Sequence, residues 1–540
     1  CSSDLIIIKR AIQQSKDGRT VDGMKHEMVP AHRVQILDPA TGTGTFLAEI
    51  IQQVRDKFEG MEGVWPSYVE QSLIPRLHGF EILMASYTIA HLKLSMTLKA
   101  TGYDRTSKNR LNVFLTNSLE EATPRTAELF AKWLADEADE ASKVKSETPV
   151  MICTGNPPYS VSSQNSGKWI TDLVADYKKN LAERNIQPLS DDYIKFIRLG
   201  HYYISKKGEG ILAFISNNSF IDGIIHRQMR KSLLDEFDQI YILDLHGNSR
   251  KKEIAPDGTE DKNVFDIMQG VSINIFVKTG KKAKGTSAEV FQKDLYGSRE
   301  QKYEWLKSTL FHSVDWERVE YTKPFYFFKP KDFSLKTTYE KGFKVSDLFL
   351  VQSTGITTCK DKVNYWDTEK QVQRMIQDLL DLSESDFREK YSTGADSRDW
   401  VYSRAKSDVQ EAVQNDTLVI APIEYRQFDT KYCVYTGKTN GIVARPRYRS
   451  LSHLLHPQNI SLIVPRQTSQ DWHHAFVSSM ITDMNILASA KLLGAGVQFP
   501  LYVSGAAGRN ILEKTLSPNF DHEVVKSIED ALGEDVVPLG

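Results

Sequence analysis

The sequence predicts an α/β protein built on a mostly parallel, doubly wound sheet. Short β-rich runs alternate with amphipathic helical segments from residue 34 to residue 277, which is typical of strand–helix–strand units. Later strand-like runs are spaced irregularly, so the architecture is expected to change near residues 320–345. We therefore expect two domains, residues 1–335 and residues 336–540, the second of mixed α+β structure.

Seven runs rich in β-branched and aromatic residues are the expected strands of the first domain. The buried run 34–37 ends at Asp38-Pro39, and apolar residues at helical spacing follow it from Phe46 to Phe58. Helical stretches separate most of the other expected strands, which lie at residues 77–81, 113–115, 150–154, 211–215, 240–245 and 271–277.

The composition limits the partners that the chain can have. With 40% apolar and 26% charged residues it is an ordinary globular composition, and a formal net charge of -2 means that any nucleic-acid contact must come from local basic patches. The four cysteines lie far apart, so neither a metal site nor a disulfide framework is predicted. No run approaches the roughly 18 apolar residues of a membrane span. We expect a cytoplasmic protein without membrane contact.

The loop from Asp38 to Phe46 joins the first expected strand to its helix. Gly42 and Gly44 let the backbone approach a ligand closely, and the helix N-terminus offers free N–H groups. Leu47 stands where a dinucleotide fingerprint needs a third glycine, and the Gly-Lys-Ser/Thr of a phosphate loop is missing, so NAD and ATP fit poorly. The loop is expected to hold another cofactor, with a structural tight turn as the alternative.

Polar residues follow two further strands. Glu81 ends the second strand, where a carboxylate can accept hydrogen bonds from ribose hydroxyls. Asn117 and Ser118 follow the third strand, where they could meet an adenine edge. Both positions also suit ordinary helix caps.

The fourth strand runs into Gly155-Asn156-Pro157-Pro158-Tyr159, the most informative segment of the chain. Two successive prolines fix φ and remove two donors, which leaves carbonyls free to accept. An amide oxygen and a proline carbonyl can take both N–H bonds of an exocyclic amine while the tyrosine stacks on the attached ring. The alternative is a turn whose tyrosine only packs.

Asp-Pro-Ala-x-Gly-x-Gly-x-Phe followed by Asn-Pro-Pro-Tyr resembles the amino-group DNA methyltransferases that make N6-methyladenine, in the γ arrangement with the recognition domain C-terminal. Residues 191–198, 245–249, 263–267 and 425–429 are similar to segments of single-chain Type ISP restriction-modification enzymes. The resemblance implies a Rossmann-like seven-stranded methyltransferase sheet, a C-terminal α+β target-recognition domain, and site-specific transfer of a methyl group to a flipped adenine in double-stranded DNA.

The resemblance also implies a role for each motif residue. The base would stack on Tyr159 and on Phe265, although Phe265 could equally be a core residue. The residues expected to line S-adenosyl-L-methionine are Asp38, Ala40, Thr41, Gly42, Gly44, Glu81 (ribose) and Asn117 (adenine), and those expected to hold the target amine are Asn156, Pro157, Pro158 and Tyr159.

DNA contacts are expected from basic residues interleaved with aromatic ones. Arginine can read guanine bidentately, and lysine mostly grips phosphate. The candidates are Arg227 and Arg230 near one sheet edge, and Lys438, Arg445 and Arg447 in the C-terminal part. For any single one of these residues, a solvated basic surface is the alternative.

Two other functions remain open on the sequence. One is a methyltransferase for an RNA base or a protein glutamine, because Asn-Pro-Pro-Tyr suits any planar amine. The other is a non-catalytic DNA-binding remnant of a restriction system, because the segment before Val34 is short for a cofactor floor. The nuclease and helicase-like modules of Type ISP enzymes are not visible, and we expect them, where present, on an N-terminal portion beyond this chain.

Overall fold

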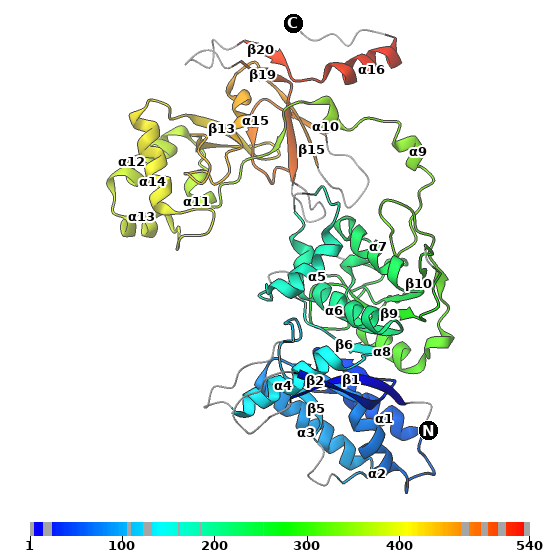
Figure 1. Ribbon diagram of the computed structural model, residues 1–540. Helices are drawn as coiled ribbons and strands as arrows, with labels where there is room; N and C mark the ends of the chain where they lie inside the picture. The colour runs from blue at the N-terminus through cyan, green and yellow to red at the C-terminus, as the bar shows by residue number, and fades with distance from the viewer. Residues whose placement is uncertain are drawn as a thin grey trace. The chain divides into compact units, whose positions relative to one another are not determined.

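The computed structural model forms two compact units, Cys1–Asp332 and Phe333–Gly540, each with its own apolar core (Figure 1). The sequence places this boundary at 335/336. The residues that the structure describes are 5–13, 24–104, 110–122, 132–159, 163–183, 185–251, 253–283, 285–465, 475–487, 495–505 and 515–533.

A nine-stranded sheet forms the centre of the first unit, in the order β11-β10-β8-β9-β7-β6-β3-β4-β5. All seven expected strands are present, and β10 and β11 extend the sheet beyond them. β9 runs antiparallel to β7 and β8, and β11 to β10, while the other pairs are parallel. The strands are β3 (Ile36–Asp38), β4 (Leu77–Glu81), β5 (Asn112–Leu115), β6 (Ile152–Gly155), β7 (Gly210–Asn217), β8 (Gln239–Asp244), β9 (Val271–Lys278), β10 (Glu289–Asp294) and β11 (Glu317–Arg318).

The direction of winding reverses at β3. The chain passes from β3 outward to β4 and β5, and then crosses back to β6 on the other side of β3. Ile36 of β3 pairs with Leu77 of β4 on one side and with Ile152 of β6 on the other. In open α/β sheets a crevice opens at the carboxyl ends of the strands at such a reversal. The loops after β3 and β6, which carry the two expected motifs, meet there.

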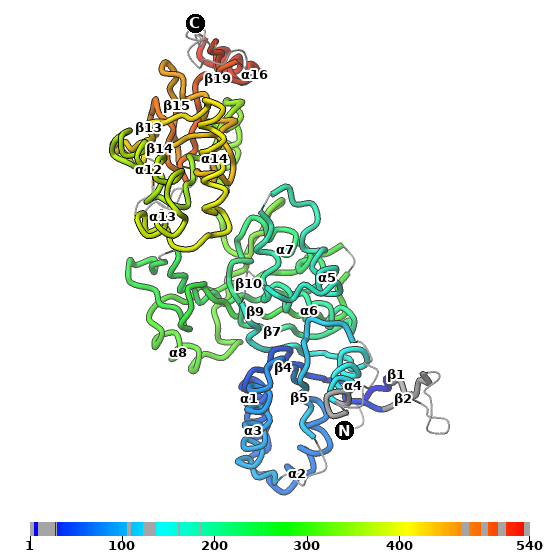
Figure 2. The backbone as a smooth tube through the Cα atoms, turned by 90° about the vertical axis from the view of Figure 1, so that its left-hand side faces the viewer, coloured from blue at the N-terminus to red at the C-terminus, as the bar shows by residue number. Residues whose placement is uncertain are grey.

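Helices cover both faces of this sheet because successive strand residues point to opposite sides. Ile36 packs with α1, α2 and α3, whereas Leu37 belongs to the larger core under α4, α5, α6 and α7. α1 and α3 lie side by side (Figures 1 and 2). The helices are α1 (Thr45–Asp56), α2 (Trp65–Tyr68), α3 (Met84–Ala100), α4 (Lys132–Glu147), α5 (Lys168–Lys178), α6 (Asp192–Lys207), α7 (Arg227–Glu236) and α8 (Arg299–Ser308).

Shorter elements complete the first unit. β1 (Leu5–Gln13) and β2 (Met24–His32) form an antiparallel hairpin that leads into β3. A π-helical turn spans Val69–Leu73, and 3₁₀ turns span Ile74–Arg76, Gln187–Ser190, Asn218–Phe220, Ile224–His226 and Phe311–Ser313.

The second unit is α+β, as expected. One sheet has the order β12-β18-β15-β16 and another the order β14-β13-β17. The strands are β12 (Ser353–Thr354), β13 (Ile420–Arg426), β14 (Asp429–Val434), β15 (Ser461–Pro465), β16 (Phe476–Ser478), β17 (Ile481–Thr482), β18 (Gly496–Pro500), β19 (Tyr502–Ser504) and β20 (Leu516–Pro518). The helices are α9 (Lys336–Tyr339), α10 (Val345–Leu348), α11 (Asp361–Asn364), α12 (Glu369–Asp381), α13 (Glu384–Tyr391), α14 (Tyr402–Gln414), α15 (Tyr448–Leu451), a 3₁₀ turn Ser452–Leu455, and α16 (His522–Leu532).

The core of the second unit lies between its helices and the β13–β14 hairpin. Met375 of α12, Val409 of α14 and Ile423 of β13 are fully buried in it together with Trp400, whose indole N–H donates to the Ile442 carbonyl at 3.1 Å. Over the described residues, no helix combines the length and the apolar character needed to cross a bilayer.

Because each unit has its own core, a fragment of residues 1–332 should fold alone. We expect it to unfold cooperatively on heating, because its main apolar clusters pack on the two faces of one sheet. Differential scanning calorimetry of the fragment and of the full chain measures this. A fragment without a transition would mean that the first unit depends on the second for its stability.

Candidate functional site

The loop after β3 is closed onto the end of β4 by backbone hydrogen bonds. Gly42 N–H donates to Glu81 Oε2 at 2.8 Å, and Thr41 N–H donates to the Phe80 carbonyl at 2.9 Å. Gly42 and Gly44 have φ of 55° and 79°, the left-handed region that glycine adopts without a steric penalty. The expected cofactor residues of β3 and β4 are therefore joined directly to one another at the start of α1.

Asp38, the last residue of β3, is fully buried beneath this loop. Its Oδ1 accepts from Ala40 N–H at 3.1 Å, while within the described structure its Oδ2 has no hydrogen-bond partner. Burial, opposed by the Ala40 hydrogen bond and aided by the charge of Glu81, raises the pKa of Asp38 to about 7. An unpaired buried carboxylate oxygen is costly unless a cation or donor reaches it.

The loop after β6 lies against Asp38. A β-carbon added at Gly155 would stand 2.6 Å from Asp38 Oδ1, so a larger residue at this position would force the carboxylate or the loop to move. Asn156 is exposed, Pro157 is buried, and the Tyr159 hydroxyl donates to Asn156 Oδ1 at 2.7 Å. Burial, and to a smaller extent the charge of Asp191, raises the pKa of Tyr159, which keeps the phenol protonated.

Asn117 joins the cofactor side to the segment beyond Tyr159. Its amide nitrogen donates to Asn165 Oδ1 at 3.1 Å and its oxygen accepts from Leu119 N–H at 3.0 Å. Asn165 in turn donates to Asp192 at 3.1 Å, and the Lys195 ammonium donates to the Asn165 carbonyl at 2.7 Å. The side chain of Asn117 is thus fixed by the protein, and the network reaches the helix α6 through Asp192 and Lys195.

Two functional candidates escaped the sequence reasoning. Ile82 and Leu83 follow Glu81 directly and expose 60% and 62% of their surface, although their N–H groups are bound to Glu81 Oε1 at 2.9 and 2.8 Å. They present an apolar surface beside the glycine loop. The sequence signal for these two residues is a pair of apolar residues directly after the acidic residue that ends a strand. Such apolar pairs are also common in helices, so the signal is weak.

Phe265 lies in the loop between β8 and β9, residues 245–270, which we call the β8–β9 loop. This loop leaves the same edge of the sheet as Asn156, because β8 and β6 share a direction and β9 is antiparallel to both neighbours. Phe265 is half-buried against Val264 and lines an open cleft. The structure brings it to the expected edge, and its stacking role stays a prediction.

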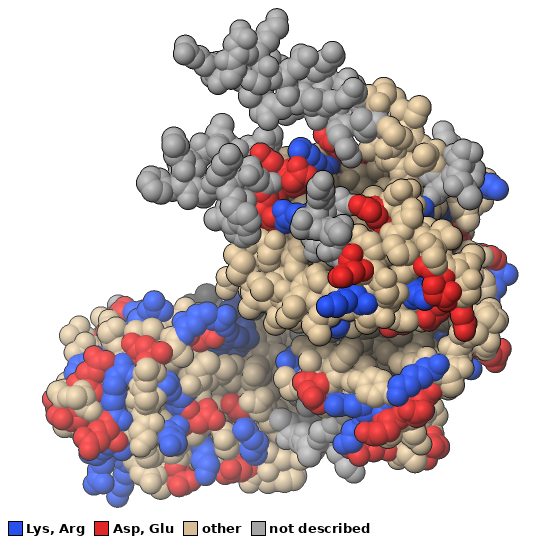
Figure 3. Space-filling view, turned by 90° about the horizontal axis from the view of Figure 1, so that it is seen from below, with Lys and Arg blue, Asp and Glu red and all other residues tan. Residues whose placement is uncertain are grey.

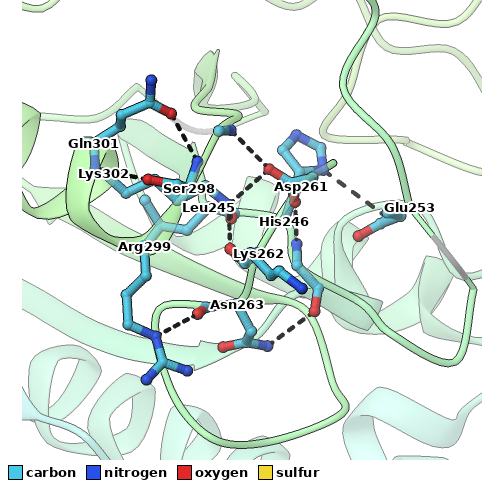
Figure 4. Close-up of polar contacts among 12 residues, drawn as sticks. Leu245, His246, Glu253, Asp261, Lys262, Asn263, Ser298, Arg299, Gln301 and Lys302 are labelled. Carbon is cyan, nitrogen blue, oxygen red and sulfur yellow. Dashed lines mark hydrogen bonds and ion pairs between the residues drawn. The ribbon is translucent and has the colours of Figure 1, made fainter. Parts of the chain in front are cut away.

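A buried ion pair fixes the β8–β9 loop (Figure 4). Lys302 of α8 pairs with Asp261 at 2.8 Å with both side chains fully buried, and it donates to the Leu245 and Lys262 carbonyls at 2.7 Å. Asn263 donates to the Gly247 carbonyl at 3.1 Å, and its own carbonyl accepts from Arg299 Nε at 2.9 Å. The loop that carries Phe265 is therefore held both by contacts from α8, through Lys302 and Arg299, and by a contact within the loop.

A second charged cluster surrounds His246 at the start of this loop. Its Nε2 lies 2.6 Å from Asp294 Oδ1, and its Nδ1 lies 3.7 Å from Asp244 and 4.0 Å from Glu253. Burial opposes a charged imidazole, but the hydrogen bonds to Asp294 and Glu253 outweigh it and raise the pKa of His246 to about 9. Burial is likewise outweighed at Asp294, where the bonded imidazolium lowers the pKa to about 2.

The trio Asp244, His246 and Asp294 is close enough to ligate a metal ion. However, the Lys329 ammonium lies 3.5 Å from Asp294, and Asp244 already accepts from Asn218 at 2.9 Å. A cation at this position would replace these contacts and face the lysine charge. We interpret the cluster as an internal ion network that stabilises the loop.

The structure corrects one expected DNA contact. Arg230 is fully buried in α7, and its guanidinium donates to the carbonyls of Phe220, Gly223, Phe325 and Tyr326 at 2.6–3.0 Å. It ties α7 to the segment before residue 330 and has no group to offer DNA. Arg227, in the same helix, forms a two-point ion pair with Glu183 and is largely buried.

The other expected DNA residues are in the second unit. Lys438 pairs with Glu411 at 2.6 Å and Arg445 with Asp399 at 3.2 Å, both on accessible side chains. Arg447 has a buried Nε without a partner in the described chain, and burial together with the charge of Arg445 lowers its pKa. Basic and acidic side chains are interspersed on the face shown in Figure 3. Of these three residues, Arg447 is the one whose buried donor atom has no partner in the described chain.

Comparison with known proteins assigns both regions to families. Residues 76–250 match the Eco57I restriction-modification methylase family, and residues 347–539 match the Type ISP C-terminal specificity domain. The chain is 25% identical over 215 residues to the Type II methyltransferase M.BstVI of Geobacillus stearothermophilus, which covers 40% of this chain and 34% of that protein. The chain thus spans about a third of the length of this curated relative.

Solved structures share the fold over nearly the whole chain. The ATP-dependent Type ISP enzyme LlaBIII bound to DNA superposes with a TM-score of 0.70 at 21% identity, over 92% of this chain and 33% of that one. A nuclease-deletion mutant of the Type ISP enzyme LlaGI, in complex with a DNA substrate mimic, gives 0.67 at 21% identity, over 92% and 41%. A DrdV–DNA complex gives 0.65 at 21% identity, over 93% and 48%.

Residues 76–250 thus match a restriction-modification methylase family and residues 347–539 match the Type ISP C-terminal specificity domain. The resemblance to a methyltransferase joined to a Type ISP specificity domain is confirmed by these two matches, and the solved structures share the fold.

The His246 cluster predicts a pH-dependent stability. Because the pKa of His246 is raised from 6.5 to about 9, its contribution is complete below pH 6.5 and is lost as the pH rises toward 9. We expect a loss on the order of 1–3 kcal/mol over this range. Thermal unfolding of the full chain between pH 6 and 10 measures it.

The matched control is His522→Gln, at an exposed histidine that begins α16. His246→Gln should be less stable than the parent at pH 6.5 and show a flatter pH profile, whereas His522→Gln should follow the parent. A parallel profile for His246→Gln would contradict the role of the imidazolium.

Proposed function

We propose that the chain is a site-specific DNA adenine-N6 methyltransferase that transfers a methyl group from S-adenosyl-L-methionine to a flipped adenine. The observation that carries the proposal is the contact between the Asp38 carboxylate and Gly155. It brings the loop suited to a cofactor against the loop suited to an amine. A donor and an acceptor of a methyl group held this way need no intermediate covalent carrier.

The residues present fit S-adenosyl-L-methionine. This cofactor carries an α-ammonium group, a ribose and a flat adenine ring, and when bound it supplies an electrophilic methyl group on a sulfonium. The unpaired buried Oδ2 of Asp38 suits the ammonium group or a water that it binds. Glu81 accepts three backbone N–H groups and keeps one acceptor site, on Oε2, for a ribose hydroxyl. The exposed Ile82 and Leu83 offer an apolar surface to the adenine.

The target amine is proposed to meet Asn156 and the Pro157 carbonyl. An amide oxygen and a prolyl carbonyl that accept the two N–H bonds turn the nitrogen lone pair toward the cofactor. The Tyr159 hydroxyl, which donates to Asn156 Oδ1, fixes the orientation of that amide before the base arrives. Because the amine nitrogen is itself the nucleophile, the chain needs no serine or cysteine at this position.

DNA is favoured over RNA or a protein glutamine by the second unit. Residues 347–539 match a specificity domain, and a domain of this kind can recognise the base sequence of a duplex. The structural relatives are described in complex with DNA. A non-catalytic remnant is less well supported, because Asp38, Gly155 and Asn156 keep an arrangement that DNA binding alone would not require.

Asn156→Ala should abolish most transfer and leave cofactor binding nearly intact. Removal of one preorganised partner of the reacting group typically lowers kcat by about 10²–10³-fold. Calorimetric titration with S-adenosyl-L-methionine and sequencing of N6-methyladenine in DNA from expressing cells measure the two properties. The control is Asn185→Ala, at an exposed loop asparagine. Methylation by Asn156→Ala near the parental rate would contradict the assignment.

Tyr159→Ala and Tyr159→Phe separate the ring from the hydroxyl. The alanine variant should lose the stacking free energy, about 1–3 kcal/mol per base, and bind the flipped base more weakly. The phenylalanine variant keeps the ring and loses only the bond to Asn156, about 0.5–1.5 kcal/mol. Steady-state kinetics on a methylatable duplex measure both. Equal activity in the two variants would remove the stacking role.

A further inference from the structure

The hairpin of β13 and β14 in the second unit ends in an unusual turn. Arg426 pairs with Asp429 as the last residues of the two strands, so Gln427 and Phe428 alone form the tip. Phe428 has φ 63°, the left-handed region that turns normally fill with glycine or asparagine. A phenylalanine there costs conformational free energy that a glycine would not.

The Phe428 ring buries almost no apolar surface on folding, so burial does not offset this conformational cost. It is 92% exposed, the largest exposed fraction among the large apolar side chains of the described chain. Strained backbone and an exposed aromatic ring at one residue both oppose folding, and such features persist where a bound partner uses them.

The strand end next to the tip is held by side-chain contacts. The Arg426 guanidinium lies 3.9 Å from the centre of the Tyr425 ring, and its Nη1 donates to Asp483 Oδ1 at 2.8 Å. Asp483 is buried and its Oδ2 accepts from the Tyr365 hydroxyl at 2.6 Å, with the Tyr365 and Tyr425 rings 4.6 Å apart. The tip is therefore supported by an aromatic and ionic stack from three segments of the second unit.

We propose that Phe428 is a wedge that inserts between two stacked base pairs when the second unit binds DNA. This inference rests on the proposed function, because it takes DNA as the partner. An apolar side chain placed between base steps unstacks them and bends the duplex, and a flat ring on a hairpin tip supported in this way suits that gap.

The surroundings of the ring favour DNA over a protein surface. The residues next to Phe428 are the polar Gln427 and the acidic Asp429, and Arg426 lies one position further. The Asp429 carboxylate pairs with Lys431 at 3.5 Å. A protein interface would need a wider apolar patch around its aromatic anchor. A single aromatic ring on an otherwise polar tip has the size and shape to fill the space between two adjacent base pairs.

The test uses the full chain and a duplex selected from a random-sequence pool by binding to it, with 2-aminopurine placed singly at each position. This base brightens when it is unstacked. In the parent we expect a bright target position, which reports base flipping, and a second bright step elsewhere in the duplex, which reports the wedge. Phe428→Gly should lose the second signal, keep the first, and bind the duplex about tenfold more weakly or worse.

Two control measurements distinguish the loss of a DNA contact from misfolding and from the general loss of an exposed ring. Phe428→Gly should unfold at the same temperature as the parent or higher, because glycine tolerates φ 63°, so weaker binding would not reflect misfolding. Phe343→Gly, at a phenylalanine of the second unit that is 52% exposed, should bind as the parent does.

The inference is overturned if the parent shows no second bright step, or if Phe428→Gly keeps that step and the parental affinity. The flipping signal at the target adenine would then leave the proposed function standing. If no duplex is enriched by the full chain, the proposed function and the wedge both fail.

Discussion

The approach of the Asp38 carboxylate to Gly155 is the constraint on which the site depends. It exists because β3 and β6 are parallel neighbours at the point where the winding of the sheet reverses, so their carboxyl ends lie side by side at the same edge of the sheet. A side chain at position 155 would push the strands apart or displace the carboxylate. Burial of Asp38 raises its pKa, and its Oδ2 has no hydrogen-bond partner among the described residues.

Most of the polar side chains around this site are engaged in holding it in shape. Glu81 binds three backbone N–H groups, and Tyr159 binds the amide of Asn156. Asn117 is tied to the segment after Tyr159 through Asn165. Groups already fixed by the protein lose little freedom when a substrate arrives, which is the physical meaning of preorganisation.

The β8–β9 loop is held in place by charge pairs. The two pairs are Lys302 with Asp261, both fully buried, and the buried His246 with the partly exposed Asp294. Removing one partner of the Lys302–Asp261 pair would leave an uncompensated buried charge. In the second unit, the carboxylate of Asp483 anchors the β13–β14 hairpin in a similar way, through Arg426 and Tyr365.

The sequence by itself determined the seven strands, the glycine loop and the Asn156–Tyr159 segment. These features depend on the spacing of apolar residues and on the backbone preferences of glycine and proline, which affect only residues close by in the chain. The sequence also indicated the two-part organisation through the change in strand spacing. It could not determine that β10 and β11 extend the sheet, that Arg230 is buried under four carbonyls, or that Asp38 meets Gly155. The sequence does not show whether an arginine faces solvent or the protein interior. Only the tertiary structure decides its burial, because the residues that cover it lie far away along the chain.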